Sequence, residues 1–286
     1  MTQQSDSSAI KEQQKQQWGR AAAGWRKHDE RFRSVTAPVT SRLLELAAVG
    51  PGHHVLDIAC GTGEPALPAA ALAGPSGFVL ATDMAAEMLE VARDKARAQG
   101  IANVEFRLAD GEELDVEPAT FDAATCRWGI MFMPEPQRCL RQAQRALRSG
   151  ARMAVSVWGP PQRNPSLALP MGILRKYIQE PLPDPTAPGG VFSFADESRL
   201  ASVFTEAGFR DVHIEGLEFP MAVFDSGYEY WQYTLDIAGP LATLVNRLPA
   251  DIQQTVRQEV AAAVAGGDPQ GPVSLNGYTL LCSAAK

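Results

Sequence analysis

The segment Val55–Ala66, with the sequence VLDIACGTGEPA, constrains the fold of this chain more than any other. Its apolar start, Val55–Ile58, is typical of a strand that is buried on both faces of a parallel sheet. Gly61 and Gly63 follow, and glycine permits backbone angles and close approaches that a Cβ would block. Pro65 suits the first turn of a helix, where its missing N–H is not needed. The segment therefore predicts a buried strand, a glycine-rich turn and a helix whose N-terminus favours an anionic ligand.

Two nucleotide-type cofactors fit such a turn. Gly61-x-Gly63-x-x-Ala66 matches the loose dinucleotide fingerprint, which makes NAD(P) one candidate. Asp57 adds a second constraint, because a buried carboxylate is costly unless it finds partners. Backbone N–H groups could satisfy it, but so could the ammonium group of S-adenosylmethionine (SAM), directly or through water. SAM also carries a carboxylate, a ribose diol and an adenine.

Strands and helices are expected to alternate along the first half of the chain. The expected strands are Val55–Ile58, Gly77–Thr82, Val104–Leu108, Phe121–Cys126 and Ala151–Trp158, and the expected helices between them are Ala66–Ala73, Ala85–Gln99 and Pro136–Leu147. Regular alternation requires parallel pairing with right-handed crossovers, and ligands then bind at the carboxyl ends of the strands. We therefore predict an α/β fold with a Rossmann-like, doubly wound and mostly parallel sheet.

Helical segments are expected on both sides of this core. Residues Ala9–Arg33 are predicted to form a helix with an apolar stripe, which either packs on the sheet edge or forms a lid over the cofactor. A second helix is expected from Thr36 to Ala48. Beyond residue 158 the predicted elements are helices Leu167–Gln179, Asp196–Ala207 and most of Tyr228–Ala265, with strands Val212–Phe219 and Leu275–Ser283. We predict one domain, 1–286, with a lid in 1–50, a core in 51–158 and substrate-cap inserts at 159–196 and 220–272.

Two more aspartates end expected strands. Asp83 lies 20 residues after Gly63, the spacing at which an acidic side chain reaches a ribose diol bound over the glycine turn. Asp110, followed by Gly111, could accept a hydrogen bond from an exocyclic adenine amine. Either aspartate alone could equally cap a helix. Together with Asp57 and the glycine turn, they favour a nucleoside cofactor.

This combination resembles the class I SAM-dependent methyltransferases, and within them the UbiE-like enzymes related to the ubiquinone/menaquinone C-methyltransferases. The segments that carry the resemblance are Val55–Gly63, Ala81–Met84, Leu108–Glu112, Phe121-Asp122 and Ala151–Trp158. The resemblance implies a seven-stranded sheet with an antiparallel last strand, for which Leu275–Ser283 is the candidate. It also implies SAM as cofactor and in-line transfer of a methyl group to an O, C or N atom of an apolar small molecule, in secondary or quinone/terpenoid-type metabolism.

The resemblance implies the site residues by position. Those expected to hold SAM are Asp57, Ala59, Gly61, Thr62, Gly63, Asp83, Met84, Asp110, Gly111, Glu112, Arg127 and Trp128. Ala59 stands where the family usually has glycine, so a slightly tighter turn is expected. The candidates for binding the acceptor also suit ordinary core packing, and they are Trp18, Trp25, Met131, Phe132 and Trp231.

The candidate catalytic base is His28, which follows the expected lid helix. A base is needed only for some acceptors, because phenols, enols and amines lose a proton easily, whereas an alcohol needs help. His53 and His54 precede the first strand and lie at its amino end, far from the expected site. His213 lies on a later strand, and its neighbours do not decide which face it occupies.

Composition excludes several functions. The formal net charge of −7 argues against nucleic acid as a partner, RNA substrates included. The four cysteines form no C-x-x-C pair, so no metal site is predicted. No apolar run approaches a membrane span and the first residues are unlike a signal peptide, so we expect a cytoplasmic monomer or homodimer.

Two other functions remain open. The first is an NAD(P)-dependent oxidoreductase, although no Tyr-x-x-x-Lys pair follows the fourth expected strand. The second is a SAM-binding protein of this fold that has lost methyl transfer.

Overall fold

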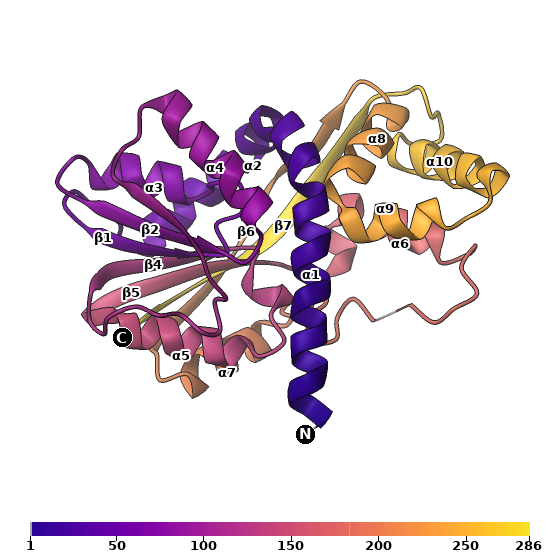
Figure 1. The fold of residues 1–286 in the computed structure, drawn as a ribbon. Coiled ribbons are helices and arrows are strands. Elements are labelled where there is room, and N and C mark those ends of the chain that lie inside the picture. The colour runs from indigo at the N-terminus through magenta and orange to yellow at the C-terminus, as the bar shows by residue number, and fades with distance from the viewer. Residues whose placement is uncertain (1, 183) are drawn as a thin grey trace.

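A seven-stranded sheet forms the centre of the computed structural model, which describes residues 2–182 and 184–286. Within these residues the strand order is β3-β2-β1-β4-β5-β7-β6 (Figure 1). The strands are β1 His54–Ile58, β2 Phe78–Asp83, β3 Val104–Leu108, β4 Phe121–Arg127, β5 Leu147–Trp158, β6 Arg210–Phe224 and β7 Val273–Ala285. Strands β1 to β5 pair in parallel, and β7 is antiparallel to both of its neighbours. The predicted Rossmann-like sheet with an antiparallel last strand is confirmed.

Helices cover both faces of the sheet. Their bounds are α1 Thr2–Lys27, α2 Asp29–Leu46, α3 Ala66–Ala73, α4 Ala86–Gln99, α5 Pro136–Ala146, α6 Pro165–Leu174, α7 Glu197–Glu206, α8 Gly227–Ile237, α9 Gly239–Asn246 and α10 Ala250–Val264, with short 3₁₀ turns at Ile130–Phe132 and Pro161–Arg163. Figure 1 shows α2, α3 and α4 on one face and α5 and α7 on the other. The core is built as the apolar pattern predicts, since Val55–Ile58 of β1 are all buried.

The long hairpin of β6 and β7 carries the helical cap. Trp158 at the end of β5 pairs with Thr279, whereas the hairpin pairing continues to Phe224 and Val273. The two strands therefore extend beyond the sheet, and α8, α9 and α10 lie between them in the chain (Figure 1). Pro220 sits at a register shift in β6, where its missing N–H is tolerated. The strand predicted to end at Phe219 is thus longer than expected.

The first helices break at a different residue from the one predicted. The chain turns at His28, so the predicted helix Ala9–Arg33 is divided between α1 and α2. Proline usually occupies the first turn of a helix, which is why a start at Thr36 was expected, but Pro38 lies inside α2. Asp29 and Glu30 instead occupy the first turn, where the helix dipole favours acidic side chains.

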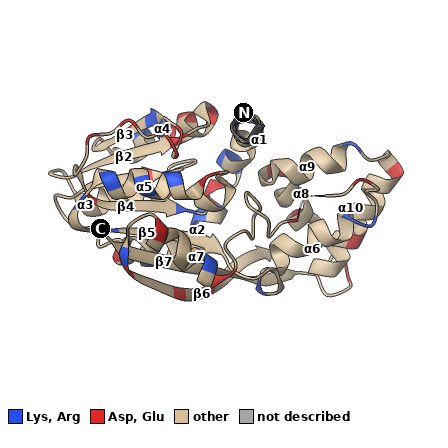
Figure 2. Cartoon of the chain, turned by 90° about the horizontal axis from the view of Figure 1, so that it is seen from below, with Lys and Arg blue, Asp and Glu red and all other residues tan. Residues whose placement is uncertain are grey.

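The surface is mixed in charge. Figure 2 shows acidic and basic residues interspersed over the helices of both the core and the cap in this view. Together with the net charge of −7, this pattern offers no excess of cations for a nucleic acid. In the part of the chain that the structure describes, no helix is long and apolar enough to span a bilayer.

Candidate functional site

A hollow opens at the carboxyl ends of β1, β2 and β3. It contains about 340 Å³ of empty space, open solvent at its mouth included. Helix α1, the three strand ends and the segment after β4 supply its lining residues, which are Lys11, Gln14, Ala59, Asp83, Met84, Ala109, Asp110, Gly111, Glu112, Met133 and Pro134. Open α/β sheets bind their ligands at this edge.

Asp83 ties the glycine turn to the start of α4. Its Oδ2 accepts a hydrogen bond from the Gly61 N–H at 2.8 Å, and its Oδ1 accepts one from the Ala85 N–H at 2.9 Å. Burial raises the pKa of Asp83, while these backbone N–H groups act in the opposite direction. A carboxylate oxygen has two acceptor sites, so each oxygen can still accept a hydroxyl of a ligand in the hollow.

The turn beside Asp83 holds its backbone in the left-handed region. Ala59 has φ of 56° and Gly61 has φ of 53°, which for a residue with a Cβ costs about 1–2 kcal/mol. Trp128, which follows the neighbouring strand β4, also has a positive φ of 53°. A Cβ on Gly129 would lie 2.5 Å from that of Ala59, so glycine is required for the two loops to pack. Such strained residues cluster at functional sites, and here they stand between β1 and β4, where the strand order reverses.

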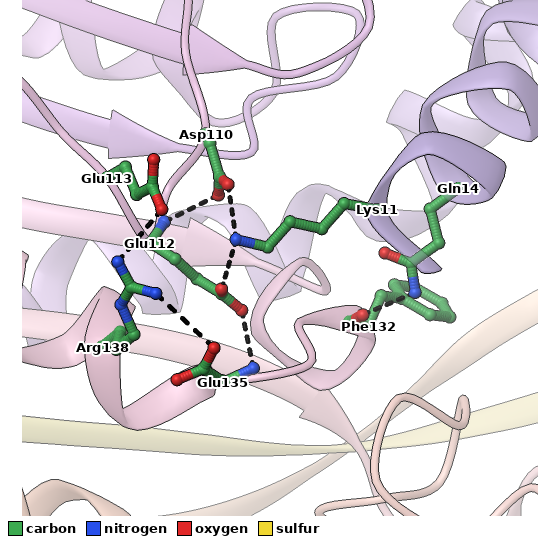
Figure 3. Close-up of polar contacts among 8 residues, drawn as sticks. All are labelled: Lys11, Gln14, Asp110, Glu112, Glu113, Phe132, Glu135 and Arg138. Carbon is green, nitrogen blue, oxygen red and sulfur yellow. Dashed lines mark hydrogen bonds and ion pairs between the residues drawn. The ribbon is translucent and has the colours of Figure 1, made fainter. Parts of the chain in front are cut away.

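An acidic pair faces α1 across the hollow (Figure 3). Lys11 Nζ lies 2.6 Å from Asp110 Oδ2 and 2.6 Å from Glu112 Oε2. Asp110 Oδ1 accepts a hydrogen bond from the Glu112 N–H at 2.9 Å, and Glu112 Oε1 accepts one from the Glu135 N–H at 2.7 Å. Burial opposes the charge of Lys11, but its bonds to the two carboxylates outweigh burial and raise its pKa.

Asp57 is buried just behind this hollow and does not line it. Its Oδ1 accepts a hydrogen bond from the Thr125 hydroxyl at 2.7 Å, whereas its Oδ2 has no partner among the described residues. Burial raises the pKa of Asp57 to about 7, and the nearby Asp83 and Glu64 add to the rise, while Thr125 and Arg127 act against it. An orphaned buried oxygen of this kind suits a cationic group or a water that bridges to one.

Arg127 is a second buried charge without a direct counterion. Its Nη1 donates to the hydroxyls of Thr36 and Thr40 at 2.9 and 3.0 Å, and its guanidinium lies over the rings of Phe32 and Trp128. Burial lowers its pKa. Among the described residues Arg127 forms no ion pair, and its Nε and Nη2 donate no hydrogen bond. These two nitrogens form the edge of the guanidinium that binds a carboxylate through two parallel hydrogen bonds.

The hollow brings together half of the residues that the sequence assigned to the cofactor. Those that line it are Ala59, Asp83, Met84, Asp110, Gly111 and Glu112. Those outside its lining are Asp57, Gly61, Thr62, Gly63, Arg127 and Trp128. Gly111 is also needed for packing, because a Cβ there would lie 2.8 Å from Ile58 Cγ2.

The residues proposed for the acceptor are not among those that line this hollow. Trp18 packs edge-on against Phe132, with ring centroids 5.3 Å apart. The Trp25 indole donates to the carbonyl of Ile237. Met131 and Trp231 are buried in the core.

His28 also lies outside the hollow lining, with its Nε2 2.8 Å from Asp236 Oδ2. His28 lies 17 residues after Lys11, at the end of α1, which corresponds to about 25 Å along a helix. Its role as a base stays a prediction.

Lys11, Gln14 and Glu64 were not identified from the sequence. Lys11 and Gln14 belong to a polar stretch that is typical of an exposed helix face. Their partners, Asp110 and Phe132, lie 99 and 118 residues further along the chain. Glu64 directly follows Gly63 and is buried, which its charge alone does not indicate.

Known proteins match the core of this chain. A family model described as a methyltransferase domain matches residues 50–167. Over 126 residues the chain is 39% identical to the ubiquinone/menaquinone biosynthesis C-methyltransferase UbiE of Ectopseudomonas mendocina (strain ymp), a match that covers 44% of this chain and 49% of that enzyme. The chain thus spans about half the length of the curated relatives it matches.

Solved structures share the fold over a longer range. One is phosphoethanolamine N-methyltransferase 2 of Haemonchus contortus in complex with SAM, with a TM-score of 0.54 and 15% identity over 89% of this chain and 56% of that one. Another is the [4+2]-cyclase SpnF, with a TM-score of 0.53 and 20% identity over 87% of this chain and 80% of that one. Residues 50–167 of this chain are thus similar to a methyltransferase domain, and the seven-stranded sheet around them has the fold of solved methyltransferase structures.

Proposed function

We propose that this protein transfers a methyl group from SAM to an O, C or N atom of an apolar small molecule. The observation that carries the proposal is the hollow that Asp83 and Asp110 line together, from neighbouring strand ends beside the strained Ala59 turn. SAM supplies a methyl group on a positively charged sulfur, so the protein's task is to bind, orient and exclude water. Positioning of this kind supplies up to about 7–11 kcal/mol of the barrier reduction.

The hollow fits the adenosine part of SAM. Asp83 presents two oxygens that accept the ribose hydroxyls in addition to their backbone bonds. Asp110 presents Oδ2 for the adenine amine, beside the small residue Gly111. Met84 also lines the hollow and would pack against the adenine.

The buried charges behind the glycine turn fit the methionine part. That part carries an ammonium and a carboxylate, and the structure places an orphaned carboxylate oxygen on Asp57 and a free guanidinium edge on Arg127. Each of these groups is costly to bury without a partner, so a ligand ammonium at Asp57 and a ligand carboxylate at Arg127 would stabilise them. The Arg127 guanidinium carbon lies 5.0 Å from the centroid of the Trp128 ring.

Aromatic side chains around Trp128 support a flat, apolar acceptor. Trp128 stacks on Trp158 with ring centroids 4.4 Å apart and an interplanar angle of 6°, and Phe219 continues the stack. The curated relatives are named for ubiquinone/menaquinone biosynthesis, which supports an acceptor of the quinone or terpenoid type. We further propose a cytoplasmic enzyme that acts as one domain, as a monomer or homodimer, with Trp18, Trp25, Met131, Phe132 and Trp231 on the acceptor side and His28 as its candidate base.

Calorimetric titration tests the cofactor. SAM and S-adenosylhomocysteine should bind the wild-type protein, whereas NAD and NADP should not. Asp110→Asn should weaken SAM binding about tenfold, because one charge-assisted hydrogen bond is lost. Asp115→Asn, an exposed aspartate in the loop after β3, is the matched control and should bind as the wild type does. Equal affinities in the two variants would remove Asp110 from the site.

Methyl transfer needs a separate test, because the same fold also hosts a [4+2]-cyclase. The protein is incubated with methyl-labelled SAM and a panel of phenols, quinone precursors and terpenoid acids. Release of S-adenosylhomocysteine with label in the acceptor supports the proposal. SAM binding without any such release across the panel would favour a SAM-binding protein that performs another reaction.

A further inference from the structure

Helix α1 is fastened across the cofactor hollow by two polar contacts one turn apart. Lys11 reaches the acidic pair Asp110 and Glu112, and the Gln14 side chain donates to the carbonyl of Phe132 at 2.6 Å (Figure 3). Both contacts join α1 to loops that line the hollow. The helix therefore closes one side of the site, and a ligand in the hollow must coexist with these contacts or displace them.

The two carboxylates differ in how much they need Lys11. The Glu112 side chain is fully buried, whereas that of Asp110 is 29% exposed. Glu112 Oε1 is satisfied by the Glu135 N–H, so its Oε2 depends on the ammonium. Asp110 Oδ1 is satisfied by the Glu112 N–H, and its Oδ2 faces the hollow with Lys11 as its partner. Without a cation, the two carboxylates would repel each other across the empty site.

We propose that Lys11 is a gate residue that competes with the adenine amine for Asp110, so that it holds α1 over the empty hollow and retains only Glu112 when the cofactor binds. This inference rests on the proposed SAM site. Lys11 Nζ donates to Asp110 Oδ2 from within the lining of the hollow, so an adenine amine that approaches this oxygen meets the ammonium there and the two donors compete for it. Because the buried Glu112 Oε2 still requires a cation, the Lys11 ammonium remains paired with Glu112 after it leaves Asp110.

The gate is specific to this position on α1. Lys15 lies one turn further along the same helix, is exposed and forms no ion pair with any described residue. It therefore carries the same charge on the same helix without the competition, which makes Lys15→Met the matched control for Lys11→Met. Methionine keeps the length of the aliphatic stem, so packing along α1 changes little.

The experiment measures SAM binding and the opening of α1 separately. Lys11→Met should bind SAM about three- to tenfold more tightly than Lys15→Met and the wild type, because an ion pair of this exposure no longer has to be broken. In the absence of SAM, amide hydrogen exchange over residues 8–18 should be faster in Lys11→Met by a similar factor. In Lys11→Met the buried Glu112 loses its counterion, which could distort the site. The double variant Lys11→Met/Glu112→Gln removes the buried charge as well, so it should bind SAM more tightly than Lys15→Met even if the single variant is distorted.

The outcomes separate the gate from the cofactor assignment. SAM affinity in both Lys11 variants that is equal to or weaker than in Lys15→Met overturns the competition while leaving the SAM site in place. Absence of SAM binding in the wild type and in Lys15→Met overturns the SAM site and the competition with it. Unchanged exchange of residues 8–18 in ligand-free Lys11→Met likewise overturns the view that Lys11 holds α1 down.

Discussion

Asp57 should make the stability of this protein fall as the pH rises through neutrality. Burial raises its pKa from 3.8 to about 7, so the folded protein holds a proton that the unfolded chain has already lost. The stabilising effect of this proton is complete below pH 3.8 and is lost as the pH rises through about 7. The difference of 7 − 3.8 = 3.2 units corresponds to about 4 kcal/mol, of which about 2.5 kcal/mol is lost between pH 5 and 8.

Urea unfolding at several pH values between 5 and 8 measures this effect. In Asp57→Asn the side chain keeps its shape and an acceptor for the Thr125 hydroxyl but cannot titrate. The difference between the wild-type and variant unfolding free energies should therefore change by about 2.5 kcal/mol across that range. Carboxylates with a pKa held at about 2, such as Asp236 and Glu215, cancel in the difference. Parallel pH profiles for the two proteins would refute the conclusion that Asp57 is buried with an unpaired oxygen.

Three more results are expected. At pH 6, SAM binding should release about 0.9 proton from Asp57, because a group with a pKa of about 7 is protonated about ten to one at this pH and the ligand ammonium favours the carboxylate form. Calorimetry in two buffers of different ionisation enthalpy measures the released proton, and Asp57→Asn should release none. Ala59→Gly should stabilise the protein by about 0.5–1 kcal/mol in urea unfolding, because glycine adopts a positive φ without strain. Gly129→Ala should destabilise it by about 1–3 kcal/mol, because the new Cβ would meet that of Ala59, and Ala59→Gly should partly restore the stability of this variant. Arg127→Lys should weaken SAM binding tenfold or more in calorimetry with little loss of stability, since lysine keeps the charge but cannot donate two parallel hydrogen bonds to a carboxylate. Unchanged affinity would contradict a carboxylate partner for Arg127.

Local patterns were sufficient to predict the sheet and one side of the hollow. The central strands β1, β2 and β4 are largely apolar runs bounded by turn residues, whereas β3 alternates apolar and charged residues, and the parallel order follows from the helices between the strands. Asp83 and Asp110 could be assigned because a strand end and its spacing from the glycine turn are both visible along the chain. The same information predicted that Asp57 holds the cofactor, but it could not show that Asp57 is fully buried and outside the lining of the hollow, since the direction in which a strand residue faces depends on its neighbours in space.

Contacts between distant segments could not be predicted in the same way. Lys11 lies in a helix that is mostly polar, and nothing in its neighbours indicates a partner 99 residues away. The break at His28 has no glycine or proline at that residue and no side-chain cap to mark it in the sequence. The length of β6 depends on its partner β7, which continues the ladder past Pro220.

The long hairpin of β6 and β7, whose pairing shifts register near Arg210 and at Pro220, bears on how molecules can reach the interior. Any swing of the cap away from the sheet would have to bend two long strands whose pairing runs from Arg210 and Ala285 to Phe224 and Val273. Helix α1, by contrast, is joined to its successor at the single residue His28 and meets the hollow mainly through side chains. The way in and out of this protein is therefore expected at its first helix, with the cap serving as a rigid wall.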